Sequence, residues 1–396
     1  MGDEILEKLP KDIVIYIFLM VPVKSLVRFK CVSKDWYTLI QSSTFIGLHF
    51  NRTTTTTKDE YMLVKRSFKE ESNRFRSVMS FLSGGLDDDD DLYPVSPDLD
   101  VPFLTTTNSC TFHRIMGPCN GLIVLTDKIT TVLFNPATRS YRLLQPGRFG
   151  CPVGFHRSIN GVGFGFDSVA NSYKIVRIAE VNGEPPFYCY TMREWKVEIY
   201  ESSVDAWREQ DQVFRQLPNV FWYPCFEMFY KGASHWFAHA NTIVILCFDI
   251  ITETFRSIKF PNTCHFQDEN CYSLLILNDS LTLICYPYPE KVVEYEKDFM
   301  EIWIMMEYGV DESWIKKYSI TPLSIETPLA VWKDHLLLLE SRSGSLISYD
   351  LNSGEVKELN LHCWPTSFRI AIYQESLTLI PEEREHSTKC PKILES

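Results

Sequence analysis

The sequence predicts a mainly β protein with a small N-terminal α domain, in which three short helices precede a six-bladed β-propeller. Apolar residues recur with helical spacing in the first fifty residues. From about residue 60 onward, short runs of Val, Ile, Leu, Phe and Tyr alternate with Gly, Pro, Asn, Asp and Ser. These β runs form units of roughly 40 to 50 residues, which is the period of a propeller blade.

The three helices are expected between residues 9 and 40. The first follows Leu9-Pro10, because proline suits the first helical turn, and Pro22 ends or kinks it. A second is expected from Val23 to Phe29, and a third from the N-cap Ser33 to Ile40. These helices carry more apolar residues than they can bury among themselves, so some should form an exposed apolar patch. The alternative is that the helices cap the domain that follows.

A repeated pattern divides the β region into hairpins. An Asn, Asp or Glu closes an apolar strand, and an aromatic or apolar residue six positions later opens the next strand. The pattern occurs at Asn135/Tyr141, Asp167/Tyr173, Glu201/Trp207, Asp249/Phe255 and Asp350/Val356, and with one extra residue at Glu307/Trp314. Because Asn and Asp side chains bond their own backbone two residues on, each match predicts a tight turn.

Five four-stranded units follow from these hairpins, near residues 111–146, 160–212, 225–261, 272–320 and 327–361. Two strands at the front (61–64 and 75–82) and two at the back (369–373 and 376–380) are expected to complete a sixth sheet. Closing the ring in this way leaves no exposed edge strand and gives a kelch-like propeller. A pair of irregular β-sandwiches is the alternative, but sandwich turns show no such higher period.

Motifs that carry chemistry are few. His235 and His239 are four residues apart in a strand context and lack further metal ligands, so both are expected on a blade surface. The glycine-rich stretch 161–166 lacks the spacing of a phosphate loop and is expected to be an inner strand with close backbone neighbours. We therefore predict no catalytic, metal-binding or cofactor-binding residues, and an enzyme is the least favoured alternative.

The cysteines and the apolar runs bear on the compartment. Twelve cysteines are scattered from Cys31 to Cys390 without a C-x-x-C pair, which is typical of a reducing compartment. The longest apolar run, 13–23, is too short to span a membrane, and the acidic residues before it do not suit a secretory leader. We expect a cytoplasmic protein, with the nucleus as a further location, and no membrane partner.

The net charge of −12 argues against binding nucleic acid, which requires a basic surface. Residues 1–50 carry a net charge of +1, so the β region carries −13. Its most acidic stretch contains the run Asp87, Asp88, Asp89, Asp90 and Asp91, followed by Asp98 and Asp100. One interpretation is a solvated, flexible insertion over 86–101. The other is an acidic arm that steers a basic protein substrate.

The N-terminal segment resembles a plant F-box. The resemblance rests on Leu9-Pro10-x-Asp12-Ile13, on Val21-Pro22-Val23-Lys24-Ser25-Leu26-x-Arg28-Phe29, and on Cys31-Val32-Ser33-Lys34-x-Trp36-x-x-Leu39-Ile40. The β region resembles the F-box-associated domain, through 117–122, 134–139, 163–167, 173–176 and 232–236. Taken together, the chain is similar to the S-locus F-box proteins of pollen.

This resemblance implies a non-catalytic substrate receptor of an SCF-type ubiquitin ligase. Such a receptor binds a Skp-type adaptor, and through it a cullin and a RING protein. The S-locus proteins bind non-self S-RNases, so that a basic protein substrate, an S-RNase, is expected. The residues expected to contact the adaptor are Leu9, Pro10, Ile13, Ile17, Val21, Pro22, Val23, Leu26, Val32 and Trp36. No motif identifies the target-binding residues.

The expected domains are then the F-box at 1–50, the β-propeller at 60–382 and a C-terminal tail at 383–396. Two alternatives remain within the binding functions. The chain could be an F-box receptor for a different plant protein, or a protein-interaction propeller without a ligase role. Association with the adaptor distinguishes the second alternative, because only a ligase receptor requires it.

Overall fold

The computed structural model describes residues 9–55, 60–71, 74–84, 92–101, 114–126, 130–145, 155–183, 194–210, 219–220, 227–239, 242–261, 270–287, 300–320 and 325–380. The described part begins with a helical unit of four helices: α2 (Lys11–Leu19), α3 (Val23–Phe29), α4 (Lys34–Gln41) and α5 (Ser43–Thr55). The three predicted helices are confirmed. The fourth, α5, was not predicted. No helix in these described ranges is long and apolar enough to cross a membrane.

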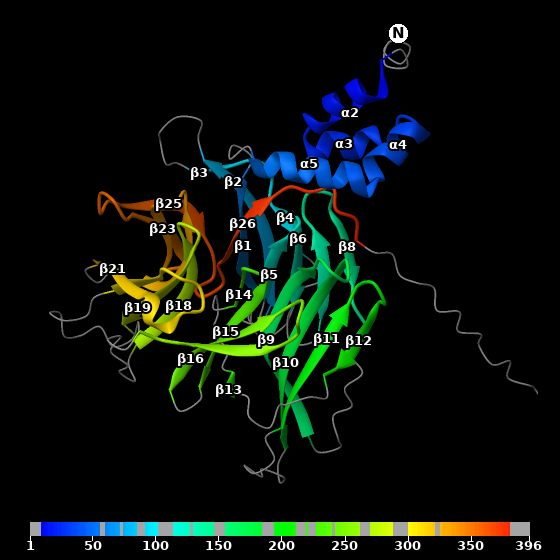
Figure 1. Ribbon diagram of the computed structural model, residues 1–396. Helices are drawn as coiled ribbons and strands as arrows, with labels where there is room; N and C mark the ends of the chain where they lie inside the picture. Colours follow the sequence, from blue (N-terminus) through cyan, green and yellow to red (C-terminus); the bar gives the residue numbers. More distant parts are fainter. Residues whose placement is uncertain are drawn as a thin grey trace, which may run out of the picture.

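The strands of the described residues form six antiparallel sheets, which we call blades 1 to 6 (Figure 1). Blade 1 contains β26 (Arg369–Gln374), β1 (Glu60–Glu71), β2 (Arg74–Gly84), β3 (Leu92–Pro94) and β4 (Leu99–Asp100). Blade 2 contains β5 (Arg114–Cys119), β6 (Leu122–Thr126), β7 (Thr131–Asn135) and β8 (Ser140–Leu143). Blade 3 contains β9 (Phe155–Asp167), β10 (Ser172–Gly183), β11 (Glu194–Glu201) and β12 (Ala206–Glu209).

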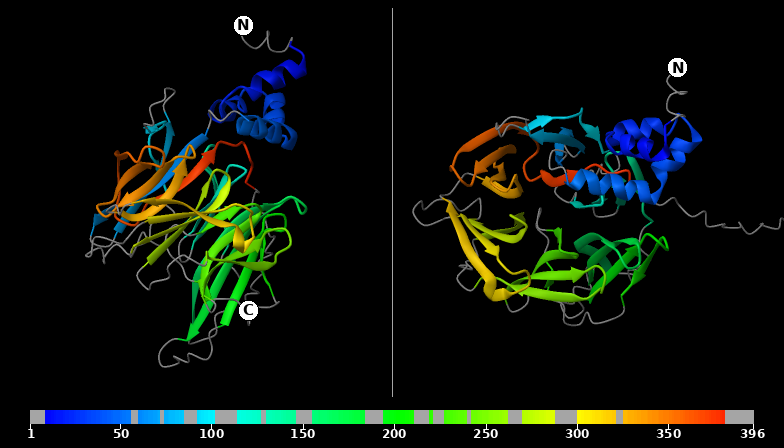
Figure 2. Two further views of the ribbon diagram at one scale, coloured as in Figure 1. Left: turned by 60° about the vertical axis from the view of Figure 1, so that its left-hand side comes forward. Right: turned by 45° about the horizontal axis from the view of Figure 1, so that its top comes forward.

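Blade 4 contains β13 (Asn219–Val220), β14 (Met228–Tyr230), β15 (Ala233–His239), β16 (Ile243–Asp249) and β17 (Phe255–Lys259). Blade 5 contains β18 (Asn270–Leu277), β19 (Ser280–Pro287), β20 (Met300–Met305) and β21 (Trp314–Ile320), with a short 3-10 helix, η6 (Asp311–Ser313), before β21. Blade 6 contains β22 (Ile325–Trp332), β23 (Leu336–Ser341), β24 (Ser345–Asp350) and β25 (Val356–His362). The six blades surround a common centre (Figure 2), so the predicted propeller is confirmed.

Blade 1 closes the ring, but not in the expected proportions. The innermost strand β26 pairs with β1, with Tyr373 opposite Tyr61. Among the described residues it is the one strand of blade 1 from the C-terminal end, and β1, β2, β3 and β4 come from the N-terminal end. The prediction that each end of the chain contributes two strands to this sheet was therefore wrong. Residues 376–380 are not a strand, because other parts of the protein hold their backbone, as described below.

The predicted hairpin repeat is confirmed, and its physical basis is visible. In Asn135, Asp167, Asp249 and Asp350, the side-chain Oδ1 accepts hydrogen bonds from the backbone N–H groups two and three residues on, at 2.6 to 3.3 Å. Four residues after each of them, the backbone adopts a positive φ of 50° to 75°. This left-handed residue turns the chain back, so that the residue two positions later opens the next strand.

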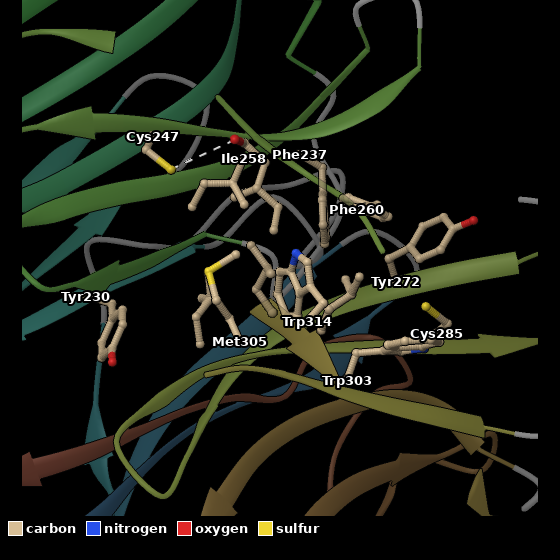
Figure 3. Close-up of a cluster of buried hydrophobic side chains, with 14 of the residues drawn as sticks. Tyr230, Phe237, Cys247, Ile258, Phe260, Tyr272, Cys285, Trp303, Met305 and Trp314 are labelled. Atoms are coloured by element: carbon tan, nitrogen blue, oxygen red, sulfur yellow. Dashed lines mark hydrogen bonds between the residues drawn. The ribbon is translucent and has the colours of Figure 1, made fainter. Parts of the chain in front are cut away.

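An apolar cluster fills each of the six junctions between neighbouring blades. Successive residues of one strand pack into different clusters: on β16, Ile245 and Cys247 face blade 5 while Leu246 and Phe248 face blade 3. Figure 3 shows the cluster between blades 4 and 5, which includes Trp303. Because both faces of an inner strand are buried, its sequence is a continuous apolar run instead of an alternating one.

The glycine-rich stretch lies on β9, the innermost strand of blade 3, as predicted. A Cβ atom added to Gly163 would lie 2.3 Å from Ser234 Oγ, and one added to Gly165 would lie 2.5 Å from the ring of Phe229. Both neighbours belong to the adjoining blade 4. Glycine is therefore required here because two blades approach each other closely.

Charged residues also connect the inner strands. Arg114 at the start of β5 donates to Glu227 at 2.9 Å and to the Ile159 carbonyl at 2.9 Å, and Glu227 accepts from the Val162 N–H at 3.0 Å. The Arg114 and Glu227 side chains are each 7% exposed. This buried ion pair joins blades 2 and 4 near the centre of the ring, and its further hydrogen bonds offset part of the cost of removing both charges from water.

Candidate functional site

Local sequence signals define the helices that carry the candidate site. Pro10 and Pro22 lie immediately before α2 and α3, where the missing proline N–H costs no helical hydrogen bond. Ser33 is the N-cap of α4, and its Oγ accepts from the Trp36 N–H at 3.2 Å. Proline and serine thus mark the starts of the three helices α2, α3 and α4.

The helices pack around an aromatic centre. The rings of Phe18 and Trp36 meet edge to face with centroids 4.8 Å apart, and Phe29 packs against both. The fully buried residues of this core are Phe18, Val23, Leu26, Ile40, Phe45 and Leu377. Leu377 comes from the far end of the chain, so the helical unit completes its core with a residue that follows the last propeller strand.

One face of α2 is apolar and exposed. Ile13, Tyr16, Ile17 and Met20 are 46%, 61%, 39% and 50% exposed. Their spacing of three and four residues places them side by side along one helix face, which we call the α2 stripe. Val32 is also exposed on the helical unit. An apolar stripe of this kind is characteristic of a protein–protein contact.

The structure divides the ten predicted adaptor contacts by burial. Pro10, Ile13, Ile17, Pro22 and Val32 are exposed, and Leu9, Val21 and Trp36 are half-buried. Val23 and Leu26 lie inside the core with 1% and 0% of their surfaces exposed. In this conformation the side chains of Val23 and Leu26 pack beneath the exposed residues of the helical unit.

Sequence reasoning missed Tyr16 and Met20. The signal was present, because Tyr16 and Met20 lie three and seven residues after Ile13 and so continue its helical face. The motif that carried the resemblance does not include either position. The full α2 stripe became visible only with the exposure of each side chain.

The predicted acidic arm divides into two parts. Asp87 to Asp91 lie outside the described residues. Asp98 accepts from Arg66 of β1 at 2.7 Å and from Ser80 at 2.8 Å, and Asp100 pairs with Arg76 of β2 at 2.7 Å. Two arginines more than twenty residues away in the sequence thus compensate Asp98 and Asp100, because β4 pairs with β2 and β2 pairs with β1.

The two histidines of β15 differ in their surroundings. His239 is exposed, whereas His235 is fully buried and its Nε2 lies 2.8 Å from the Tyr308 hydroxyl. Burial, with a smaller effect of the Arg256 charge, lowers the pKa of His235 to about 4. The expected surface position is wrong for His235, because the strand turns this side chain toward blade 5. The described residues contain no group of three or more His, Cys, Asp or Glu that could hold a metal ion.

These features define a propeller protein whose N-terminal helical unit presents an apolar face for protein contacts. Comparison with known families agrees: a model of the F-box domain matches residues 6–46, and a model of the F-box associated beta propeller domain matches residues 91–377. The chain belongs to the family of F-box proteins with an F-box-associated β-propeller. Proteins of this family are generally substrate receptors of SCF ubiquitin ligases, in which the F-box binds Skp1.

Similar proteins occur in Arabidopsis thaliana. F-box protein CPR1 is 28% identical over 395 residues, covering 94% of this chain and 89% of the relative. F-box protein At3g07870 is 25% identical over 414 residues, covering 94% and 92%. F-box/kelch-repeat protein At3g23880 is 24% identical over 359 residues, covering 87% and 88%. The similarity therefore extends over the helical unit and the propeller together.

Proposed function

We propose that this protein is a substrate receptor of an SCF-type ubiquitin ligase and that the α2 stripe contacts a Skp-type adaptor. The observation that supports this is the unbroken exposure of Ile13, Tyr16, Ile17 and Met20 on a unit whose own core is already filled. Through the adaptor, the receptor would join a cullin and a RING protein. The propeller would hold the target.

In this role the receptor needs no catalytic group. Holding a target near the charged conjugating enzyme raises the effective concentration of the target lysines, which converts a bimolecular encounter into a local one. The rate then depends on the distance and orientation between the adaptor and the bound target.

We further propose that the target is a basic protein, and specifically an S-RNase, which would make this chain a pollen factor of self-incompatibility. The net charge of −13 on the β region and the resemblance to S-locus F-box proteins support this target. The alternative is a different plant protein target, and it keeps the same ligase role.

Co-purification of the full chain with a purified Skp-type adaptor tests the ligase role. Ile17→Asp is expected to weaken adaptor binding at least about 30-fold, because a charge would be buried at the centre of the contact. Val169→Asp is the matched control, since Val169 is an exposed apolar residue of the propeller, 81% exposed. Absence of binding by the wild-type chain would favour an interaction propeller without a ligase role.

Binding of the full chain to purified S-RNases at several salt concentrations tests the target. Tight binding that weakens with salt is expected. If the chain binds the adaptor but no S-RNase, the result would favour the alternative in which this receptor binds a different plant protein.

A further inference from the structure

The residues after the last propeller strand cross from the ring to the helical unit. Ser376, Leu377 and Thr378 follow β26, and Figure 1 shows this segment passing beneath α5. We call Ser376–Thr378 the strap. All three residues are at least largely buried, with Ser376 and Leu377 at 0% and 1% exposure.

The propeller holds the strap at its two ends. Asn135, at the end of β7 in blade 2, is fully buried. Its Nδ2 donates to the Ser376 carbonyl at 3.0 Å and to the Thr378 carbonyl at 2.9 Å. Thr378 Oγ1 in turn donates to the Asn120 carbonyl at 2.9 Å. The two carbonyls that flank Leu377 are therefore fixed by one side chain.

The helical unit holds the strap at its centre. Leu377 packs into the helical core with Phe18, Leu26 and Phe45, each at most 2% exposed. Gln374 adds a long contact from its Nε2 to the Phe50 carbonyl of α5 at 3.5 Å. Blade 2 grips the backbone on both sides of Leu377, and the helices enclose its side chain.

Asn135 differs from its counterparts in a way that fits this role. The turn between the third and fourth strands begins at Asp249 in blade 4 and at Asp350 in blade 6, and Asp167 begins a similar turn between the first two strands of blade 3. In all four turns a side-chain oxygen accepts from the backbone, for which a carboxylate serves as well as an amide. Only an amide also supplies N–H donors. Asparagine therefore stands at the one of these positions where two carbonyl groups of the strap must be satisfied.

Gly121 supports the same conclusion independently. A Cβ atom added to Gly121 would lie 2.2 Å from Ser376 Cβ, so the strap passes directly over this turn. Gly232 occupies the matching turn of blade 4 with a similar φ of 79°, against 75° for Gly121, and has nothing within 4 Å. The backbone angle requires glycine at both positions, and only Gly121 must also leave room for a neighbouring segment.

We propose that the strap locks the helical unit to the propeller in one orientation, with Asn135, Gly121 and Leu377 as its positioning residues. The proposal rests on the ligase role proposed above for its consequence, because a fixed orientation sets the distance between the adaptor and the bound target. The locking itself is a property of this chain alone and can be measured without any partner.

The first experiment compares Asn135→Asp with Asp249→Asn in the full chain. Asn135→Asp keeps the oxygen that caps its turn and removes both donors to the strap. Two hydrogen bonds correspond to about 30-fold in an opening equilibrium, so amide exchange at 376–378 and in α5 should accelerate by about that factor. Asp249→Asn should leave the amide exchange rates at 376–378 and in α5 unchanged. Equal exchange in wild type and Asn135→Asp would overturn the proposal.

The second experiment measures orientation. Dyes are attached through unnatural amino acids at positions 37 on α4 and 356 on β25, whose native side chains are both 49% exposed. Single-molecule energy transfer should give one narrow distribution for wild type and a broad one for Gly121→Ala, with Gly232→Ala as control. If Gly232→Ala broadens the distribution as much as Gly121→Ala does, strain in the turn is the cause and the proposal is contradicted. If neither variant broadens the distribution, the strap does not lock the helical unit to the propeller.

The third experiment tests the consequence for the ligase. With reconstituted adaptor, cullin and RING protein, ubiquitination of the receptor's own lysines is mapped by mass spectrometry. Asn135→Asp should spread the modified positions while leaving the affinity for the adaptor within about 2-fold. Failure of the wild-type chain to bind the adaptor would contradict the ligase role. It would not change the interpretation of the first two experiments, which need no partner. An unchanged map, with exchange accelerated, would overturn the proposed effect on transfer.

Discussion

Lys174 of β10 and Glu253 of the β16–β17 turn form an ion pair at 2.7 Å that connects blade 3 to blade 4. The Lys174 ammonium also lies 2.7 Å from Asp167, and Glu253 accepts from Arg208. The Lys174 and Asp167 side chains are 6% and 4% exposed, so water screens the attraction between their charges very little. Three charged residues on strands of blade 3 and one in a turn of blade 4 thus join this blade junction.

Lys174→Met is expected to lower the free energy of unfolding by about 3 kcal/mol, because it leaves a buried carboxylate without its partner. Chemical denaturation at pH 7 measures this. Lys316→Met is the control, since the exposed pair of Lys316 with Glu301 should contribute less than about 1 kcal/mol. Equal losses in the two variants would contradict the importance of burial.

The same network predicts a dependence on acid. Burial acts to raise the pKa of Asp167 and of Glu253, but hydrogen bonds from Lys174, and from Arg208 to Glu253, hold both below their ordinary values. A carboxyl with a lowered pKa stabilises the fold above its unfolded value and loses that stabilisation as the pH falls through the folded value. Wild type should therefore lose more stability than Lys174→Met between pH 5 and about pH 3.

His235 predicts a second, higher window. Burial lowers its pKa from 6.5 to about 4, so between these values the unfolded chain binds a proton that the folded chain does not. Stability should fall by roughly 3 kcal/mol as the pH drops from 6.5 to 4. His235→Gln can keep a hydrogen bond to Tyr308 and should lack this step. Denaturation curves at half-unit intervals of pH compare the two, and identical slopes would contradict a neutral, buried imidazole.

The helical unit separates a core effect from a surface effect. Leu26→Ala should destabilise the helical unit by about 2 to 5 kcal/mol, because Leu26 is fully buried. Ile17→Ala should cost less than about 1 kcal/mol, since Ile17 is partly exposed already. Amide exchange of α2 to α4 distinguishes the two. Slower or equal exchange in Leu26→Ala would show that the packing described for this core is wrong.

The acidic stretch predicts two different responses. Replacing Asp87 to Asp91 by Asn should slow association with a basic S-RNase and flatten its salt dependence, if these charges steer the target. Asp98→Asn should instead lower stability with little change in association rate, because Arg66 already compensates Asp98. Stopped-flow association at several salt concentrations measures both rates. An unchanged salt slope after removal of the five aspartates would assign them to a linker.

Local signals made most of the blades predictable. Asn135, Asp167, Asp249 and Asp350 each fix a turn with their own backbone, so the turn is encoded within a few residues. The apolar runs between these turns identify strands buried on both faces. Neither signal depends on contacts with distant parts of the chain.

The predictions failed where contacts between residues far apart in the sequence determine the structure. Residues 376–380 alternate like a strand, yet Asn135 and the helical core capture them. Helix α5 was missed because its sequence contains a glycine and four threonines, which are residues of low helix propensity. Val23 and Leu26 match the F-box pattern as closely as Ile13 does, and a motif alone does not separate residues that support a surface from residues that form it.

The pairing of β26 with β1 sets the order in which this protein is completed during synthesis. Tyr61 leaves the ribosome roughly 300 residues before its partner Tyr373, and at 5 to 20 residues per second that delay is about 15 to 60 seconds. Through that interval β1 lacks its inner neighbour and the helices lack Leu377. A prematurely terminated chain therefore has both an open ring and an incomplete helical core, so full-length translation is a condition for a finished receptor.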